Sequence, residues 1–257
     1  MYLYIYDSYL NDKKYQTVLT KIESRLADLG INGRTAKMTI LKNMRETILD
    51  GIKKGAETIV AVGNDKTLFE VIRILAREPV TVGYIPVGTR STIAPVLAIP
   101  EDEKACDVLS ARLSEKMDIG KVNNQYFLSS IEVDKGSVSI QCDGRYWITP
   151  TSTDSQIQIC NLTAQPKIAS RSTFKCNPQD GFLETIISSS APSGKIVGFF
   201  QKSFARPSVF TARRLKIVSQ SESVTLIVDG QPVAKTPVTV EILPKLLKVI
   251  VGKKRMF

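Results

Sequence analysis

Two short polar turns carry the residues of this chain whose types and spacing are best suited to chemistry. The first is Gly63-Asn64-Asp65-Lys66-Thr67, which follows the apolar run 58–62 and precedes apolar residues at helical spacing. A strand, a tight turn and a helix together aim free backbone N–H groups and the positive end of a helix dipole at one spot. Such a spot binds phosphate, so the sequence predicts an anion-binding turn; an ordinary strand–helix connection is the competing interpretation.

The second turn is Gly88-Thr89-Arg90-Ser91-Thr92, which closes the strand-like run 80–87. One helix and one strand separate the two turns, so both are expected at the same edge of a parallel sheet. Ligands of open α/β sheets bind outside the carboxyl ends of the strands. The candidate phosphate-binding residues are therefore Gly63, Asn64, Asp65, Lys66, Thr67, Gly88, Thr89 and Ser91.

The start of the helix after the first turn is predicted from a capping box. Thr67 is expected at the N-cap and Glu70 three residues later, at N3. Lys66 directly precedes this cap, and we expect its side chain at the mouth of a cleft between two domains rather than in the core. Asp65 is open to two interpretations, a ligand-binding carboxylate and a helix-capping side chain.

Composition excludes several kinds of site. The 257 residues include no histidine, which rules out Ser-His and Cys-His catalysis. The four cysteines have no C-x-x-C spacing, so a Cys/His zinc site is not expected, and buried reduced thiols are predicted at Cys106, Cys142, Cys160 and Cys176. A net charge of +10 favours anionic partners without choosing among them.

The layout of the chain predicts a cytoplasmic protein. It contains no transmembrane run, and its N-terminus lacks the basic-then-apolar pattern of a signal peptide. Basic groups at Arg206, Arg213, Arg214, Lys216 and 253–255, with phenylalanines nearby in 194–214, suggest contact with an anionic membrane; scattered solvated charge is the competing interpretation. Whether the chain forms a homo-oligomer stays open.

Alternating strand and helix patterns in residues 1–114 predict a doubly wound parallel sheet. Strands are expected at 2–6, 35–39, 58–62 and 80–87. Helices are expected at 11–29, 41–54, 67–75, between Pro95 and Ile99, and at 102–113.

Residues 115–257 change to β-rich segments without intervening helices, which indicates an antiparallel sandwich or barrel. The segments are 125–133, 137–142, 155–162, 181–188, 215–219, 225–228, 238–242 and 247–251. Asp229-Gly230 is the sharpest hairpin signal. The predicted fold is thus an α/β nucleotide-binding domain followed by an antiparallel β-sandwich, whose C-terminal end is expected to pack back on the first domain.

Four stretches resemble the diacylglycerol kinase and sphingosine kinase superfamily. AVGNDKTLFEV is similar to its G-G-D-G-T-x-N-E motif, and IPVGTRSTIAPVLAIP to its I-P-x-G-T-x-N-D-x-A-x-x-L-x-I-P segment. NPQDGFLETII resembles its D-D-G-x-L-D strand, and residues 208–252 resemble its closing run with V-D-G-E and T-P. The resemblance covers most of the chain in the right order and implies the fold shared by NAD kinases and diacylglycerol kinases.

The resemblance also implies a function. It implies ATP at the two turns, Mg²⁺, a lipid acceptor, and Asp180 as the general base. The motifs are degenerate, however: Asn64 and Lys66 replace glycines, Ser91-Thr92 replaces Asn-Asp, and Gln179 replaces an acidic residue.

Three functions follow as hypotheses. The first is an ATP-dependent lipid kinase, cytoplasmic and peripheral to the membrane. The second is a catalytically inactive pseudokinase that retains nucleotide or anion binding. Nucleic-acid binding has only the net charge in its favour, because no RNP, helix-turn-helix or zinc-finger pattern is present.

Overall fold

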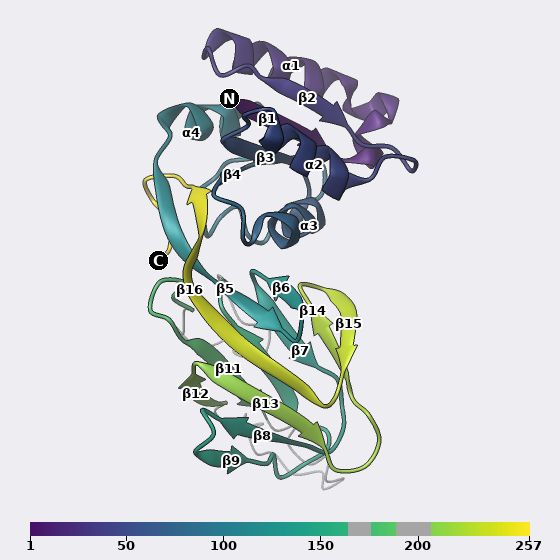
Figure 1. Cartoon of the computed structure of the whole chain (residues 1–257), viewed down its shortest axis with the longest axis vertical. Coiled ribbons are helices and arrows are strands. Elements are labelled where there is room, and N and C mark those ends of the chain that lie inside the picture. The colour runs from purple at the N-terminus through teal and green to yellow at the C-terminus, as the bar shows by residue number, and fades with distance from the viewer. Residues whose placement is uncertain (164–175, 189–206) are drawn as a thin grey trace, which may run out of the picture.

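The computed structural model describes residues 1–163, 176–188 and 207–257. Its first half contains four parallel strands in the order β2-β1-β3-β4 (Figure 1). Their bounds are β1 Tyr2–Tyr6, β2 Arg34–Lys37, β3 Thr58–Gly63 and β4 Thr81–Pro86. The strands are buried on both faces, so they are continuous apolar runs, as in 59–62.

Helices cover both faces of this sheet. They are α1 Gln16–Asp28, α2 Met44–Lys53, α3 Asp65–Leu75 and α4 Ala105–Ala111, with 3-10 turns at Ser8–Asn11, Lys13–Tyr15 and Asp102–Lys104. α1 packs against α4, and α2 packs against α3 and β1; Figure 1 shows the two pairs on opposite sides of the strands. The predicted doubly wound sheet is therefore confirmed.

The second half is an antiparallel sandwich, as predicted. One sheet has the order β12-β11-β10-β7-β14-β15, and the facing sheet contains β5, β6, β16, β13, β8 and β9. The strands are β5 Ser114–Val122, β6 Gln125–Phe127, β7 Ser130–Val133, β8 Val138–Cys142, β9 Tyr146–Ile148, β10 Gln156–Cys160, β11 Leu183–Ser188, β12 Ser208–Ala212, β13 Arg214–Ser219, β14 Thr225–Val228, β15 Gln231–Lys235 and β16 Val238–Ile250. A second apolar core fills the space between the sheets.

β16 connects the two halves. The sequence predicted two strands, at 238–242 and 247–251, but the structure has one long strand with a bulge between Leu243 and Leu247. Its first part pairs with β13 and β5 in the sandwich, and Lys248 and Val249 then pair in parallel with β4. A domain boundary between 114 and 115 stays a prediction, since one sheet runs through both halves.

Two further local predictions were wrong. Residues 95–99 form turns rather than a helix, closed by the bond from the Ile99 amide to the Ala94 carbonyl (2.8 Å). The capping box after the first turn is also absent: α3 begins two residues before Thr67, and Asn64 is its N-cap. The asparagine side chain competes successfully for the cap because it reaches the Thr67 amide.

Other predictions were confirmed. Asp229 and Gly230 both have positive φ, 49° and 76°, and link β14 to β15 as a tight hairpin. All four cysteines are free and buried. Of the basic–aromatic stretch 194–214, residues 194–206 lie outside the described part, including Phe199, Phe200, Phe204 and Arg206.

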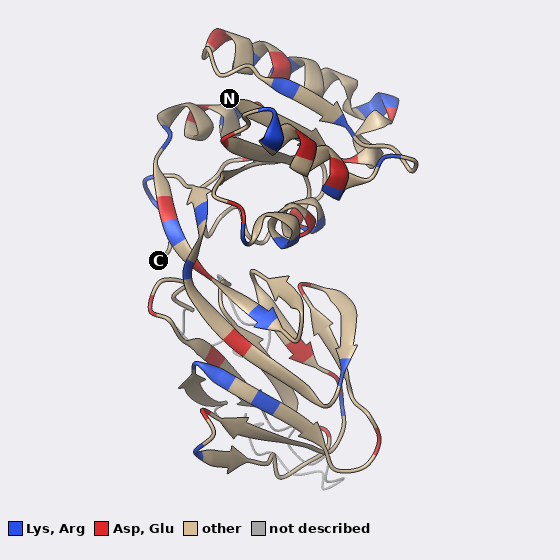
Figure 2. Cartoon of the chain, in the orientation of Figure 1, with Lys and Arg blue, Asp and Glu red and all other residues tan. Residues whose placement is uncertain are grey.

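Charged side chains are spread over both halves of the described chain (Figure 2). Within the described residues, no helix is long and apolar enough to cross a membrane.

Candidate anion site at the edge of the parallel sheet

The two predicted turns lie side by side. Strand register aligns Tyr6 with Val62, and Gly63 with Pro86, so β1, β3 and β4 end at one edge. The Val87 amide bonds to the Gly63 carbonyl (2.9 Å), which ties the start of the second turn to the first. The two turns therefore lie at the same edge of the parallel sheet, as the sequence predicted.

The first turn delivers the N-terminus of α3 to this edge. Asn64 Oδ1 accepts from the Thr67 amide (3.2 Å), and Thr67 Oγ1 donates to Asp7 Oδ2 (2.6 Å). A side chain at Gly63 would place its Cβ 2.4 Å from Thr67 Oγ1, so the turn needs glycine there. The amides of Asp65 and Lys66, at the first two helical positions, have no acceptor within the helix and are available to an anion.

Asp65 joins the two turns. One carboxylate oxygen accepts from Tyr84 Oη (3.0 Å) and from Ser91 Oγ, and the other accepts from the amide (2.7 Å) and hydroxyl (2.8 Å) of Thr92. Four donors from β4 and the second turn therefore meet one carboxylate. Asp65 acts neither as the helix cap nor as a free acid; it is a clamp between the two turns.

The second turn is held by further hydrogen bonds. Besides donating to Asp65, Ser91 Oγ accepts from the amides of Ile93 (3.2 Å) and Ala94 (2.8 Å). Gly88 has a φ of 92°, which residues with a side chain rarely adopt. A Cβ there would lie 3.3 Å from Tyr15 Oη.

Tyrosines complete the wall of this edge. Tyr9 Oη donates to the Val87 carbonyl (2.7 Å), and its ring meets Tyr15 edge to face at 5.4 Å. Burial raises the pKa of Tyr84, and the neighbouring Asp65 charge raises it further, so its hydroxyl remains a donor at neutral pH. Burial likewise raises the pKa of Tyr9.

Seven of the eight candidate residues divide into two groups, and the eighth, Gly63, is buried in the first turn. The side chains of Asp65, Thr67 and Ser91 are committed to bonds within the protein. Lys66, Gly88 and Thr89 are exposed, and Asn64 is half-buried. The exposed position of Lys66 agrees with its predicted absence from the core. Asp7, which sequence reasoning missed, also lies here; its signal was an acidic residue directly after the first strand.

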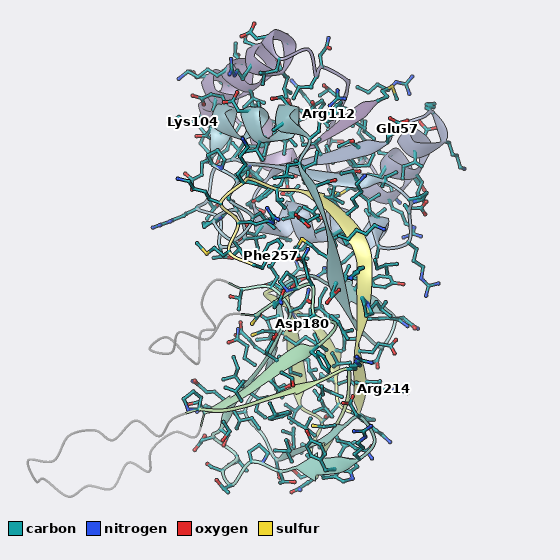
Figure 3. The ribbon with its side chains drawn as sticks, turned by 90° about the vertical axis from the view of Figure 1, so that its left-hand side faces the viewer. Glu57, Lys104, Arg112, Asp180, Arg214 and Phe257 are labelled. Carbon is teal, nitrogen blue, oxygen red and sulfur yellow. The ribbon has the colours of Figure 1, made fainter. Side chains whose placement is uncertain are left out.

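Asp180 is not part of this cluster. It is exposed, its Oδ1 caps its own turn by accepting from the Phe182 amide (2.9 Å), and Figure 3 shows it at the narrow middle of the molecule. Its loop is joined to β16 through Asp118, which accepts from the amides of Gly181 and Lys245. Lys245 lies three residues before Lys248, which pairs with the first residue of β4. The two turns instead follow the last residues of β3 and β4, so Asp180 lies toward the opposite end of β4.

A buried carboxylate that the sequence did not single out fixes the loop of Asp180. Asp118, on β5, is fully buried and accepts from the amides of Gly181 (2.7 Å) and Lys245 (2.8 Å). Its own amide donates to the Pro178 carbonyl (2.6 Å). Gln179 adds a bond to Glu115 (3.1 Å), which itself pairs with Arg255. This network holds the β11 loop against the bulge of β16.

Glu184 is the acid with the most perturbed surroundings near Asp180. Burial, followed by the charge of Asp180, raises its pKa to about 7. Its Oε2 is buried without a hydrogen-bond partner.

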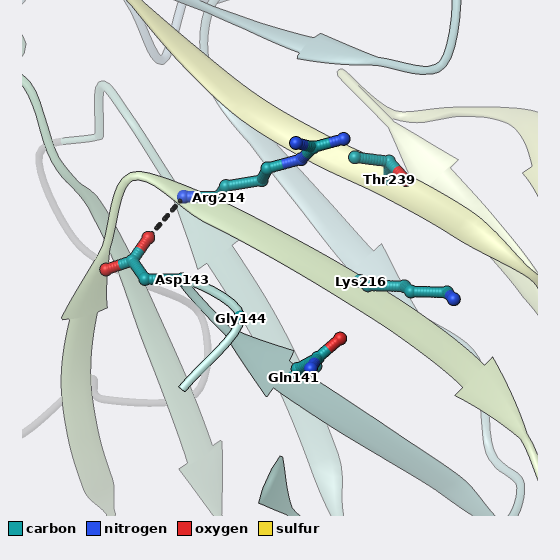
Figure 4. A pocket seen from close by; sticks show the side chains of 6 residues that line it. All are labelled: Gln141, Asp143, Gly144, Arg214, Lys216 and Thr239. Carbon is teal, nitrogen blue, oxygen red and sulfur yellow. Dashed lines mark hydrogen bonds between the residues drawn. The ribbon is translucent and has the colours of Figure 1, made fainter. Parts of the chain in front are cut away.

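A shallow pocket of about 380 Å³ lies elsewhere, on the outer face of the sandwich (Figure 4). It is lined by Gln141, Asp143, Gly144, Arg214, Lys216 and Thr239. Asp143 Oδ1 accepts hydrogen bonds from the amides of Arg213 (3.0 Å) and Arg214 (2.8 Å). The pocket shares no residue with the two turns.

The fit to Mg²⁺ is poor in the part of the chain that the structure describes. No three Cys, Asp or Glu side chains there are grouped as a metal would need. Asp65, the acid nearest both turns, already accepts four hydrogen bonds. Mg²⁺ is usually bound by one or two carboxylates together with substrate phosphates and water, so a site here would need a carboxylate oxygen that Asp65 already commits to the turns.

Comparison with known proteins agrees with the resemblance drawn from the motifs. Residues 2–122 match the family model of the diacylglycerol kinase catalytic domain. The chain is 29% identical to a diacylglycerol kinase of Bacillus subtilis over 130 residues, which cover 49% of this chain and 43% of that protein. It is 41% identical to a diacylglycerol kinase of Staphylococcus aureus over 76 residues, which cover 28% of this chain and 24% of that protein.

The fold is matched over the whole length. A crystal structure of a diacylglycerol kinase from Bacillus anthracis superposes with a TM-score of 0.77 at 20% identity, covering 99% of this chain and 98% of that one. The predicted resemblance to the lipid kinase superfamily and the predicted two-part fold are thus confirmed. The sequence matches with these two relatives span less than half of their length.

Proposed function

We propose that the chain is a lipid kinase-like phosphotransferase, which binds ATP at the two turns and transfers phosphate to a hydroxyl of a diacylglycerol-like lipid. The observation that carries the proposal is the Asp65 clamp, which holds two phosphate-sized turns together at the carboxyl edge of a parallel sheet. The similarity to proteins described as diacylglycerol kinases supports the lipid acceptor.

In this proposal the chain contributes positioning and charge. The amides of Asp65 and Lys66 receive a phosphate group, and the exposed cations Lys66 and Arg90 compensate its negative charge. Phosphoryl transfer depends mainly on such positioning and electrostatic stabilisation. A bound Mg²⁺ would neutralise charge on the phosphates; the described residues contain no group of three acids that would hold it by themselves.

Asp180 is proposed as the general base on the resemblance alone. Its loop is held by Asp118, and no hydrogen bond among the described residues joins Asp180 to either turn. Loss of phosphate transfer in Asp180→Ala with ATP binding intact would support this role, and unchanged transfer would contradict it.

A second candidate function is a pseudokinase that binds nucleotide without turnover. The observation in its favour is that acids are already hydrogen-bonded within the protein or replaced where a kinase would need them. The Asp65 carboxylate is saturated with donors, and Gln231 stands at the Glu position of the V-D-G-E motif, where it accepts from Arg73 (3.4 Å).

Labelled ATP with a panel of lipid acceptors tests the proposal directly. Diacylglycerol and a sphingoid base are offered in mixed micelles with Mg²⁺ or Mn²⁺ present. We expect transfer to at least one acceptor, and loss of transfer in Asp65→Ala. Absence of transfer with every acceptor, together with ATP binding in calorimetry, would establish the pseudokinase instead.

Lys66 reports on how the anion is held. Its position beside the free amides predicts that Lys66→Ala weakens ATP binding several-fold, since one exposed cation near the phosphates is lost. Lys66→Gly separates the alternatives: stronger binding than in the parent would mean that the lysine itself occupies the phosphate position. Equal affinity in all three proteins would show that Lys66 takes no part in the site.

A further inference from the structure

The loop between β2 and α2 presents two apolar side chains in a way that core packing does not explain. The Lys42 amide bonds to the Thr39 carbonyl (3.1 Å), which makes residues 39–42 a tight turn with Ile40 and Leu41 at its centre. These central positions usually hold Gly, Pro, Asn, Asp or Ser. Here they hold a β-branched and a long aliphatic residue.

Both side chains are almost fully exposed to solvent. Ile40 is 100% exposed and Leu41 is 96% exposed, whereas the next most exposed large hydrophobic residue of the described chain, Trp147, is 51% exposed. Scattered half-exposed apolar residues are ordinary on a protein surface, but an adjacent pair that is almost fully exposed is not.

The base of the turn is fixed. Met38 is buried, its amide bonds to the Tyr6 carbonyl (2.9 Å) and its carbonyl accepts from Asn11 Nδ2 (2.9 Å). On the other side Asn43 caps α2 through the Glu46 amide (3.3 Å). Ile40 and Leu41 are therefore held out on a short, anchored projection, which Figure 1 shows extending beyond the end of β2.

Positive charge surrounds this projection. Lys37, Lys42 and Arg45 are exposed, and Lys42 Nζ reaches back to the Lys37 carbonyl (3.2 Å). The Lys13–Tyr15 turn follows Asn11, which contacts Met38, and adds Lys13 and Lys14. Three acids offset part of this charge: Asp12 pairs with Lys14, Glu23 pairs with Lys37, and Glu46 follows Arg45.

The projection also faces the same way as the anion site. β2 pairs in parallel with β1, so its carboxyl end lies at the edge where Asp7 and the two turns are found. A surface touching Ile40 and Leu41 would therefore lie beside the edge at which the proposed nucleotide binds.

We propose that the turn 39–42 is a membrane-docking element, which inserts Ile40 and Leu41 into an anionic bilayer while the flanking lysines and arginine bind lipid head groups. Apolar side chains within a basic surround fit the interface of an acidic membrane, where burial of the apolar tip and attraction to anionic lipid add together. This inference names the membrane contact for the lipid kinase proposed above and takes its biological sense from that function. Vesicle binding itself requires no catalysis, so the two proposals fail independently.

The test is sedimentation with vesicles in the absence of nucleotide. Phosphatidylcholine vesicles containing phosphatidylglycerol should pellet the parent protein, and pure phosphatidylcholine vesicles should pellet much less. The double variant Ile40→Ser, Leu41→Ser should lower the partition coefficient by about tenfold or more, because two aliphatic side chains leave the bilayer. Lys42→Gln should lower it by a smaller factor, and added salt should abolish that difference.

Tyr146→Ser with Trp147→Ser is the matched control, since it removes the exposed aromatic pair of β9 from the sandwich. This control should bind like the parent. A tryptophan placed at the tip gives a second readout: Leu41→Trp in a Trp147→Tyr background should shift its emission to the blue when anionic vesicles are added.

Three results would overturn the proposal. These are vesicle binding unchanged in the Ile40→Ser, Leu41→Ser protein, binding lost only in the β9 control, and no emission shift at position 41. Ultracentrifugation of the parent and the loop variant adds a fourth: if the loop changes abolish a dimer and leave vesicle binding intact, the tip is a contact between copies of the chain.

Discussion

Asp65 is the residue on which the geometry of the candidate site depends. Asp65→Asn keeps the size of the side chain but replaces one acceptor oxygen by an amino group that faces donors. We expect a loss of about 2–4 kcal/mol in the free energy of unfolding, because several bonds of one network are broken together. Urea denaturation measures it.

Asp107→Asn is the control for this substitution, since Asp107 is an exposed carboxylate that pairs with Arg25 on the surface. It should change the unfolding free energy by less than about 1 kcal/mol. Similar losses in the two variants would mean that Asp65 does not clamp the turns.

Glu184 gives a prediction for pH. The pKa of its carboxyl is about 7 in the folded state, whereas the ordinary pKa of a glutamate is 4.5. The folded state therefore binds more protons than the unfolded chain in this window, and the stability contributed below pH 4.5 is lost as pH rises through 7. Glu184→Gln should remove this loss, which is about 3 kcal/mol for a shift of this size.

Denaturation curves recorded from pH 5 to pH 8 measure how the free energy of unfolding changes with pH. Glu222→Gln, at an exposed position, should follow the pH dependence of the parent. If Glu184→Gln also follows it, Glu184 is ionised in the folded protein throughout and the assigned shift is wrong.

At the scale of elements, the β14–β15 hairpin is held by a single buried carboxylate. Asp229 accepts from the amides of Leu128 (3.0 Å), Ser129 (2.8 Å) and Ser130 (3.3 Å), while its own φ is 49°. Burial raises its pKa to about 6, and the three amides work against that rise.

Two substitutions separate the conformational role of Asp229 from its acceptor role. Asn tolerates positive φ and keeps one acceptor, so Asp229→Asn should cost about 1–2 kcal/mol of unfolding free energy. Asp229→Ala loses both properties and should cost about 3 kcal/mol or more. Thermal or urea unfolding of both variants decides, and equal costs would contradict the conformational part of the argument.

Elements were predictable from the sequence where one local signal acted alone. The strands 2–6 and 58–62 and the Asp229-Gly230 hairpin follow from apolar runs and turn chemistry, and the structure has them. The cap of α3 was misplaced because Asn64 and Thr67 are both good capping residues, and the choice depends on Asp7, which lies far away in sequence and takes the Thr67 hydroxyl. The two segments of β16 looked separate because the bulge at 243–247 interrupts the apolar alternation.

The candidate site was predictable only in part. The two turns and their shared edge follow from strand–helix alternation, which fixes the end of the sheet where loops gather. The clamp was not predictable, because it requires knowing that Tyr84, Ser91 and Thr92 reach the Asp65 carboxylate. The position of Asp180 was not predictable either, since it depends on where the loop before β11 meets the bulge of β16.

At the scale of the whole molecule, one sheet runs from the parallel half into the sandwich. β16 pairs with β5 and β13 at one end and with β4 at the other, and Asp118 fixes the β11 loop to its bulge. The two halves are thereby joined through backbone hydrogen bonds rather than by a linker alone. Two regions of the described surface offer basic side chains: the edge with the two turns, and the Arg214–Lys216 pocket on the sandwich.

A crystal soaked with ATP and Mg²⁺ distinguishes these regions most directly. The account predicts phosphate density within hydrogen-bonding distance of the Asp65 and Lys66 amides, against the turn that begins at Gly88, with the Asp65 clamp intact. Nucleotide density in the pocket of Arg214 and Lys216, or an empty edge at saturating ATP, would contradict it.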